Sequence, residues 1–318
     1  MGKIGRRSFL ALGTAVAAAP FLPAATGKVD EDLAVFLSDI HVSAGTKGHY
    51  GKDLPKIVDR ILALKPRPRT VVDFGDLACG AGELEAYRLA RPQFERLWAA
   101  GIRTIHLMGN HDRRGNFRTV FPEAAKATLV PDRQVYELHF KHLDFLFLDT
   151  LGGDDNGTDQ HPKPDLGDAQ TAYLKNYLAA AKRPFMIGSH HQLGSFRFGK
   201  ENLKDVLLTN PQCAGFVHGH LHTWSTEWFP SPHWKYLTSF HAVGLPSADC
   251  DGDIGYVQFR PLADRAVFKL DQWDFWFHRP IRAGEVAPPC WRQRVEDNMR
   301  GGGVTLVYDR RVPANVKI

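Results

Sequence analysis

Five short groups of potential metal ligands recur along this chain of 318 residues. They contain Asp, Asn and His, whose carboxylate, carboxamide and imidazole donors suit ions such as Zn, Mn and Fe. No Cys-x-x-Cys pair offers a competing thiolate site. So many ligands indicate two metal ions, and two ions indicate a hydrolase because they activate water. The groups are Asp39-Ile40-His41, Gly75-Asp76, Gly109-Asn110-His111-Asp112, His190-His191 and Gly219-His220-Leu221-His222.

Each group follows a short apolar run that is typical of a buried strand. These runs are rich in Val, Ile, Leu and Phe and are bounded by Gly or polar residues. Ligands at strand ends converge on one edge of a sheet, where α/β folds place their sites. A single group of this kind arises by chance, but five in order at strand ends indicate a functional site. The expected strands are 33–37, 70–74, 102–107, 184–187 and 214–217.

The remaining pattern supplies helices between these strands and further strands after the last group. Apolar residues at helical spacing predict helices over 53–64, 83–99 and 168–181, with a weaker candidate at 201–209. Residues 235–240, 255–259 and 266–270 are expected to be strands that complete the second of two sheets. Residues 276–318 form a basic extension that ends in a strand at 304–308. The sequence therefore predicts an α/β protein.

At these groups the chain resembles the calcineurin-like metallophosphoesterases, over about residues 32–275. The resemblance implies a four-layer αββα sandwich, in which two mixed sheets are flanked by helices. It also implies a centre of two divalent or mixed-valence ions of Fe, Mn or Zn. By the same resemblance, Asp39, His41 and His222 hold the first ion, Asn110, His190 and His220 hold the second, and Asp76 bridges them.

The resemblance also implies the chemistry of the site. Two ions roughly 3.5–4 Å apart share a bridging hydroxide that attacks phosphorus in line with the leaving oxygen. His111 would stabilise charge or protonate the leaving oxygen. Asp112 would orient His111, or else form a salt bridge or a helix cap. Adjacent residues of an extended segment point to opposite sides, so His191 is expected to line the substrate cleft or to form a hydrogen bond outside the ligand set.

The five ligand groups together predict the type of reaction, but they do not identify the substrate. It is shared with class III cyclic-nucleotide phosphodiesterases and glycerophosphodiesterases, and it also serves monoesterases and nucleases. Small phosphodiesters or nucleotides are the first expectation and phosphomonoesters the second. A non-catalytic metal-binding scaffold is the alternative of another class, although every ligand position is filled. Arg113 and Arg197 are candidates to bind substrate, and Phe196 or Phe198 could stack on a base or remain in a solvated turn.

Cysteine positions separate this chain from neighbouring subfamilies. Cys79 lies three residues after Asp76, where purple acid phosphatases carry Tyr and Ser/Thr protein phosphatases carry a second Asp. This difference argues against a tyrosinate-iron site. Cys79 could itself become a thiolate ligand, or it could be a small buried side chain. Cys250 and Cys290 could form a disulfide, or all four cysteines could be free.

Residues 1–27 resemble a twin-arginine export signal. Gly5-Arg6-Arg7-Ser8-Phe9-Leu10 precedes a short uncharged stretch and a run of small residues. An uncleaved anchor or a packed amphipathic helix are the alternatives. The export machinery is thus an expected partner, membrane contact is expected only through the leader, and the expected location is periplasmic or secreted.

Composition limits the classes of function further. The chain is 43% hydrophobic and 11% aromatic, as in a globular protein with an ample core. Its formal net charge is +5, and three of the basic residues lie in the leader. The remaining balance is not that of a dedicated nucleic-acid binder. We therefore expect a small phosphoester substrate and no stable nucleic-acid partner.

Overall fold

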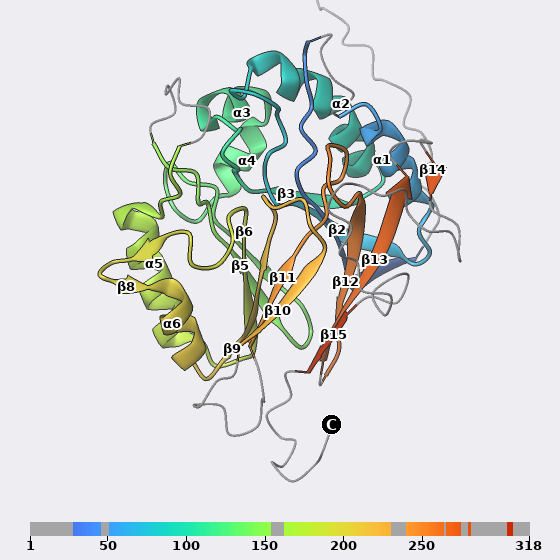
Figure 1. The fold of residues 1–318 in the computed structure, drawn as a ribbon. Coiled ribbons are helices and arrows are strands. Elements are labelled where there is room, and N and C mark those ends of the chain that lie inside the picture. Colours follow the sequence, from blue (N-terminus) through green and yellow to red (C-terminus); the bar gives the residue numbers. More distant parts are fainter. Residues whose placement is uncertain are drawn as a thin grey trace, which may run out of the picture.

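The computed structural model describes residues 28–45, 51–153, 162–229, 240–263, 265–274, 279–280 and 304–307. In these residues two large mixed β-sheets face each other (Figure 1). The expected leader and most of the C-terminal extension lie outside the described residues. Among those described, no helix is both long enough and apolar enough to cross a membrane.

The first sheet carries the first three ligand groups at its strand ends. Its strands are β1 (Val29–Leu37), β2 (Arg67–Asp73), β3 (Arg103–His106), β12 (Gly255–Pro261), β13 (Arg265–Asp274), β14 (Arg279–Pro280) and β15 (Val304–Val307). Their order is β14-β13-β12-β1-β2-β3, and β15 also pairs with β13. Because β1, β2 and β3 are parallel, their carboxyl ends lie at the same edge.

The second sheet carries the two histidine-rich groups. Its strands are β4 (Tyr136–His139), β5 (Asp144–Phe147), β6 (Phe185–Ser189), β9 (Cys213–His218), β10 (Ser225–Phe229) and β11 (Phe240–Gly244). Their order is β10-β11-β9-β6-β5-β4, and β6 runs parallel to β9. A separate short hairpin pairs β7 (Arg197–Phe198) with β8 (Glu201–Asn202).

Helices cover the outer face of each sheet (Figure 1). The first sheet is flanked by α1 (Leu54–Ala63), α2 (Leu84–Ala99), α3 (Arg114–Val120) and α4 (Pro122–Ala127). The second is flanked by α5 (Gly167–Ala180) and α6 (Leu203–Thr209). The amphipathic spacing explains this placement: in α1, for example, Leu54, Ile57, Val58 and Ile61 are all buried.

Three apolar layers hold the four structural layers together. The middle layer lies between the sheets, where Phe36 stacks on Phe259 and meets Phe145 edge to face. A second layer lies between the first sheet and its helices, and a third between the second sheet and α5 and α6. The predicted αββα sandwich is therefore confirmed.

The five ligand-bearing strands and the helices over 53–64, 83–99, 168–181 and 201–209 are present close to their expected bounds. The strands predicted at 255–259 and 266–270 form, but assigning them to the second sheet was wrong. They are β12 and β13, and β12 pairs with β1 of the first sheet. Of the strand expected at 235–240, only Phe240 is described, where β11 begins. After β11 the chain therefore crosses from the second sheet to the first, where β12 pairs with the edge of β1 that β2 leaves open.

Candidate metal centre

The five predicted ligand groups meet where the two sheets adjoin. Backbone hydrogen bonds join loops of the first sheet to one another: Asp39 N donates to Gly75 O at 3.0 Å, and His41 N to Asp76 O at 2.9 Å. In the second sheet, Gly219 N donates to His190 O at 3.0 Å. The loops are thus fixed to one another by main-chain contacts before any ion binds.

The backbone turns sharply at most of the ligands. Non-glycine residues rarely adopt positive φ values because Cβ then crowds the main chain. At this centre such values bring residues two positions apart toward the same point, as with Asp39 and His41. The ligand residues with positive φ are Asp39 (53°), His41 (54°), Asp76 (54°), His220 (69°) and His222 (50°).

Two glycines of the motifs are required by close packing. A Cβ on Gly109 would overlap the backbone nitrogen and the carboxylate of Asp76. A Cβ on Gly219 would overlap the side chain of Ser38, beside Asp39. These glycines therefore let one ligand loop lie directly against another.

Asp39, His41 and His222, the expected ligands of the first ion, lie close together, and we call this group the first site. The Nε2 atoms of His41 and His222 are 3.3 Å apart, and His222 Nε2 lies 3.2 Å from Asp39 Oδ1. Asp39 Oδ2 is occupied by the Ser38 hydroxyl and the backbone N–H of His220. Oδ1 therefore faces the two imidazoles, as a metal ligand would.

Asn110, His190 and His220, the expected ligands of the second ion, also lie close together, and we call this group the second site. His190 Nε2 lies 3.3 Å from Asn110 Oδ1, and the rings of His190 and His220 are 5.2 Å apart between centroids. His190, His191 and His220 form one of the groups whose ligand atoms all lie within 4.8 Å. The predicted second ligand set is thus gathered in one place.

Asp76 lies between the two sites. Its Oδ2 is 3.7 Å from His41 Nε2 of the first site and 3.2 Å from His190 Nε2 of the second. Its Oδ1 accepts a hydrogen bond from His111 N at 2.8 Å. The carboxylate is therefore in the position that a bridging ligand needs.

Outer hydrogen bonds determine which ring nitrogen of two histidines faces the centre. His190 Nδ1 lies 3.0 Å from the carbonyl oxygen of Phe74, so Nδ1 carries the proton and Nε2 offers a lone pair. His222 Nδ1 contacts Asp251 Oδ1, and its Nε2 likewise faces the centre. Metal-binding histidines are held in this way in known proteins.

Two imidazoles of the centre pair with carboxylates: His190 with Asp76, and His222 with Asp39. Burial would lower the pKa of His190, but the Asp76 carboxylate raises it to about 9. Burial would also lower the pKa of His222, yet Asp39 and Asp251 raise it. Burial lowers the pKa of His41 and of His220 to about 4 each. A cation placed between these groups would replace the protons that now neutralise Asp39 and Asp76.

The residues present fit a metal centre. Asp39 Oδ1 is fully buried and has no hydrogen-bond partner, which is costly unless a cation completes its shell. All seven proposed ligands offer oxygen or nitrogen donors, which Fe, Mn and Zn accept. The unpartnered oxygen is the most direct sign that an ion belongs here.

His111 lies beside the centre without being in either ligand set. Its Nδ1 donates to Gly80 O at 2.8 Å, and its ring centroid is 5.0 Å from that of His41.

Asp112 does not have the predicted role of orienting the His111 ring. It is buried, and its carboxylate accepts from Asp76 N, Ala78 N, Gly109 N and the Tyr87 hydroxyl. Burial raises its pKa to about 7, and its contacts hold two ligand loops together.

The predicted substrate-binding residues have different positions. Arg113 is buried, and its guanidinium donates to the carbonyl oxygens of Asn110 and Asp112. This corrects the expectation of a substrate contact, because the side chain supports the loop instead. Arg197 is exposed in β7, so its role stays a prediction. His191 is buried, with Nδ1 2.8 Å from Thr150 Oγ1 and its ring beside that of His220.

Phe196 and Phe198 could have stacked on a base or lain in a solvated turn with one of them buried. Both side chains are instead buried, in the apolar layer beneath the second sheet. The sequence interpretation also missed Asp251 and Cys250, which lie in the segment between β11 and β12. That segment has no metal-binding spacing, and only its position in the fold brings it to the first site. Of the cysteines, Cys79 and Cys250 are free thiols, and Cys290 lies outside the described residues.

The comparisons with known proteins agree with this geometry. The model of the family described as calcineurin-like phosphoesterase matches residues 34–224. A probable cyclic nucleotide phosphodiesterase of Rhodopseudomonas palustris is 32% identical over 211 residues, which is 59% of this chain and 70% of that protein.

Solved structures show the same fold. A dimetal phosphatase from Danio rerio has a TM-score of 0.60 and 14% identity, covering 87% of this chain and 99% of the other. A purple acid phosphatase from yellow lupin, Lupinus luteus, has a TM-score of 0.55 and 14% identity, covering 79% and 52%.

Two facing sheets with Asp, Asn and His ligands at their joined edges define a metal-dependent phosphoester hydrolase. The family model covers more than half of the chain, and the chain belongs to the calcineurin-like phosphoesterase family.

Proposed function

We propose that the protein is an exported phosphoesterase with two metal ions that hydrolyses small phosphodiesters or nucleotides. The observation that supports this most directly is the position of Asp76 Oδ2, between His41 Nε2 and His190 Nε2. A single carboxylate placed between two imidazole-rich sites suits two ions and not one. The resemblance to a probable cyclic nucleotide phosphodiesterase supports a diester substrate.

The bound ions would supply an activated water and a clamp on the phosphoryl oxygens. Asp39, His41 and His222 would hold one ion, and Asn110, His190 and His220 the other. Fe, Mn and Zn all suit these donors.

His111 would complete the reaction as the proton donor to the leaving oxygen. Its Nδ1–H is committed to the Gly80 carbonyl, which leaves Nε2 as the nitrogen that can carry the transferred proton. Asp76 Oδ1 accepts from the His111 backbone N–H, so the bridging carboxylate and the proton donor are fixed relative to one another.

The test compares two chromogenic esters on metal-replete protein of measured metal content. Hydrolysis of bis-para-nitrophenyl phosphate in excess of para-nitrophenyl phosphate is expected for a diesterase. The reverse order would make the protein a phosphomonoesterase of the same fold. Two bound ions with hydrolysis of neither ester would favour a non-catalytic metal-binding scaffold. Asp59→Ala, on the exposed face of α1, is the control variant and should behave as the parent protein.

We also propose export by the twin-arginine pathway to a periplasmic or secreted location, which the Arg6-Arg7 leader supports. That pathway carries folded proteins and would allow the ions to be loaded first. Replacing Arg6 and Arg7 together by Lys should retain the protein inside the cell, whereas Lys3→Ala should not. Equal distribution of the two variants between cell fractions would contradict the proposal.

A further inference from the structure

Residues 245–254 cross from β11 of the second sheet to β12 of the first and lie against the first site. Ala248 N donates to Ser38 O at 2.7 Å, and Ser247 Oγ to the main-chain oxygen of Asp39 at 2.8 Å. Asp253 N donates to His222 O at 2.8 Å. The segment is therefore hydrogen-bonded to the main chain beside or at two of the three first-site ligands, although it lies beyond the residues that match the family model.

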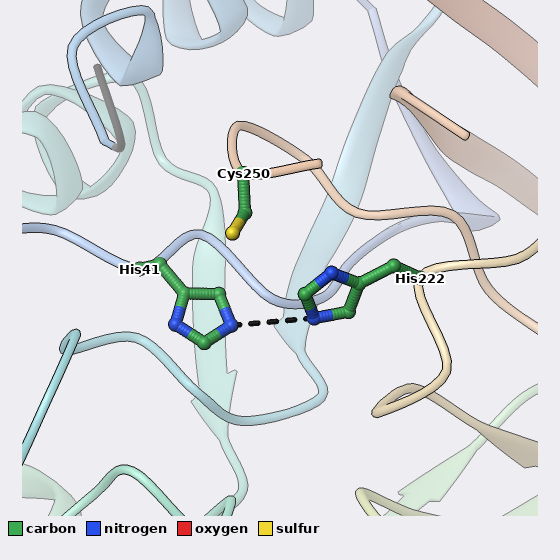
Figure 2. A group of neighbouring side chains, drawn as sticks. All are labelled: His41, His222 and Cys250. Atoms are coloured by element: carbon green, nitrogen blue, oxygen red, sulfur yellow. Dashed lines mark hydrogen bonds between the residues drawn. The ribbon is translucent and has the colours of Figure 1, made fainter. Parts of the chain in front are cut away.

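Cys250 is the side chain of this segment that enters the site. It is buried, with 6% of its surface exposed, and its N–H donates to Ser247 Oγ at 2.9 Å. Its Sγ and one ring nitrogen each of His41 and His222 all lie within 4.8 Å of one another. Figure 2 shows the sulfur directed toward the space between the two imidazole rings.

A second observation shows that the same space suits a cation. Asp39 Oδ1 is buried without a hydrogen-bond partner and lies 3.2 Å from His222 Nε2 and 3.9 Å from His41 Nε2. The thiol thus lies beside two imidazoles that both face this carboxylate oxygen. The other cysteines differ: Cys213 lies in the outer apolar layer, with Sγ 3.7 Å from Gly215 O, and Cys79 is in none of the ligand groups found among the described residues.

We propose that Cys250 is a thiolate ligand of the ion in the first site. This inference rests on the proposed function, since it concerns one of its two ions. On binding, the S–H bond is replaced by a sulfur–metal bond, and the proton leaves to solvent. A thiolate favours Zn, Co or Fe over Mn, so Cys250 would bias the metal preference of the first site while the second keeps oxygen and nitrogen donors only.

Cobalt substitution tests the bond directly, because a thiolate bound to Co²⁺ gives a near-ultraviolet charge-transfer band that histidine and carboxylate ligands do not. Protein loaded with two Co²⁺ should show this band, and Cys250→Ser and Cys250→Ala should lose it. Cys213→Ala and Cys79→Ser are the matched thiol controls and should keep it. Circular dichroism checks that each variant is folded. If Cys250→Ser does not fold, Cys250→Ala is used for the same measurement.

Metal titration gives a second readout. Cys250→Ser should weaken Zn²⁺ binding at one of the two sites by about tenfold or more, with a smaller change for Mn²⁺. If folded parent protein bound two Co²⁺ and hydrolysed phosphoesters but showed no charge-transfer band, Cys250 would not be a thiolate ligand. The proposed function would still stand. Loss of the band in Cys79→Ser instead of Cys250→Ser would lead to the same conclusion. Protein that binds no metal and cleaves neither ester would overturn the proposed function together with this inference.

Discussion

The two candidate metal sites have Asp76 between them but are supported by different outer contacts. In the first site, His222 is backed by the carboxylate of Asp251, which is half exposed. In the second, His190 is completely buried and is backed by the neutral carbonyl of Phe74. A negative partner makes an imidazole a better donor than a neutral partner does. We therefore expect the first site to bind its ion more tightly.

The difference also follows the boundary of the family match. The ligands of both sites up to His222 lie within residues 34–224, whereas Asp251 and Cys250 lie outside them. Among the described residues, the segment from 245 to 254 contacts the first of the two candidate sites, at His222 and Asp39. A segment that the family model does not match thus lies beside one of the two candidate sites.

The largest effect should come from the residue that both sites share. Asp76→Ala removes the bridge, so both ions should bind weakly and hydrolysis should fall by about a thousandfold, which corresponds to roughly 4 kcal/mol of transition-state stabilisation. Metal analysis and turnover of bis-para-nitrophenyl phosphate measure the two effects, with Asp59→Ala as control. Retention of both ions would show that Asp76 is not a bridge.

His111→Ala should separate chemistry from metal binding. Loss of a general acid lowers turnover by about a hundredfold or more, while both ions should stay, because His111 belongs to neither site. Turnover and metal content are measured on the same preparation. If the variant lost its ions, the residue would have to be reassigned as a ligand.

Asp251→Ala tests the asymmetry itself. Removing an outer carboxylate partner costs about 10–100-fold in metal affinity, and only the first site should be affected. Asp251→Asn keeps a hydrogen-bond acceptor and should restore part of the affinity. Calorimetric titration resolves the two binding events. A loss shared equally by both events would remove the distinction drawn between the sites.

Thr150→Val is the corresponding change beside the second site and should have the smallest effect. It removes the hydrogen-bond partner of His191 Nδ1, a contact between neutral groups worth about 1 kcal/mol. A change of about fivefold in KM or in second-site affinity is expected, measured by the same titration and by steady-state kinetics. An effect as large as that of Asp251→Ala would mean that neutral contacts support the centre as strongly as charged ones.

The sequence was sufficient to predict the layers and to identify residues that the fold brings together, while their role as metal ligands stays a prediction. Asp39, Asn110 and His190 follow apolar strands, and metal chemistry restricts which residue types can occupy such positions. It was not sufficient for Asp112 and Arg113, which were predicted to act in catalysis and substrate binding because they are charged. Both side chains are buried and make hydrogen bonds that support the ligand loop.

The remaining differences arise from contacts between distant segments. The hairpin of β4 and β5 was not predicted, and β12 was assigned to the wrong sheet, because pairing depends on which edge is open when the layers assemble. Asp251 could not be found for the same reason. No local sequence pattern predicts that the loop containing Asp251 crosses from one sheet to the other beside His222.

The positive φ values at Asp39, His41, Asp76, His220 and His222 have a consequence for how such a centre persists. Each unfavourable backbone conformation costs on the order of 1–3 kcal/mol, and glycine would relieve it at every one of these positions. At Asp39 that gain is opposed by the loss of the hydrogen bonds that its carboxylate accepts from Ser38 and from His220 N–H, and of its pairing with His222. Five strained residues at one centre are therefore a cost to folding, and the ions of the proposed function would offset that cost when they bind.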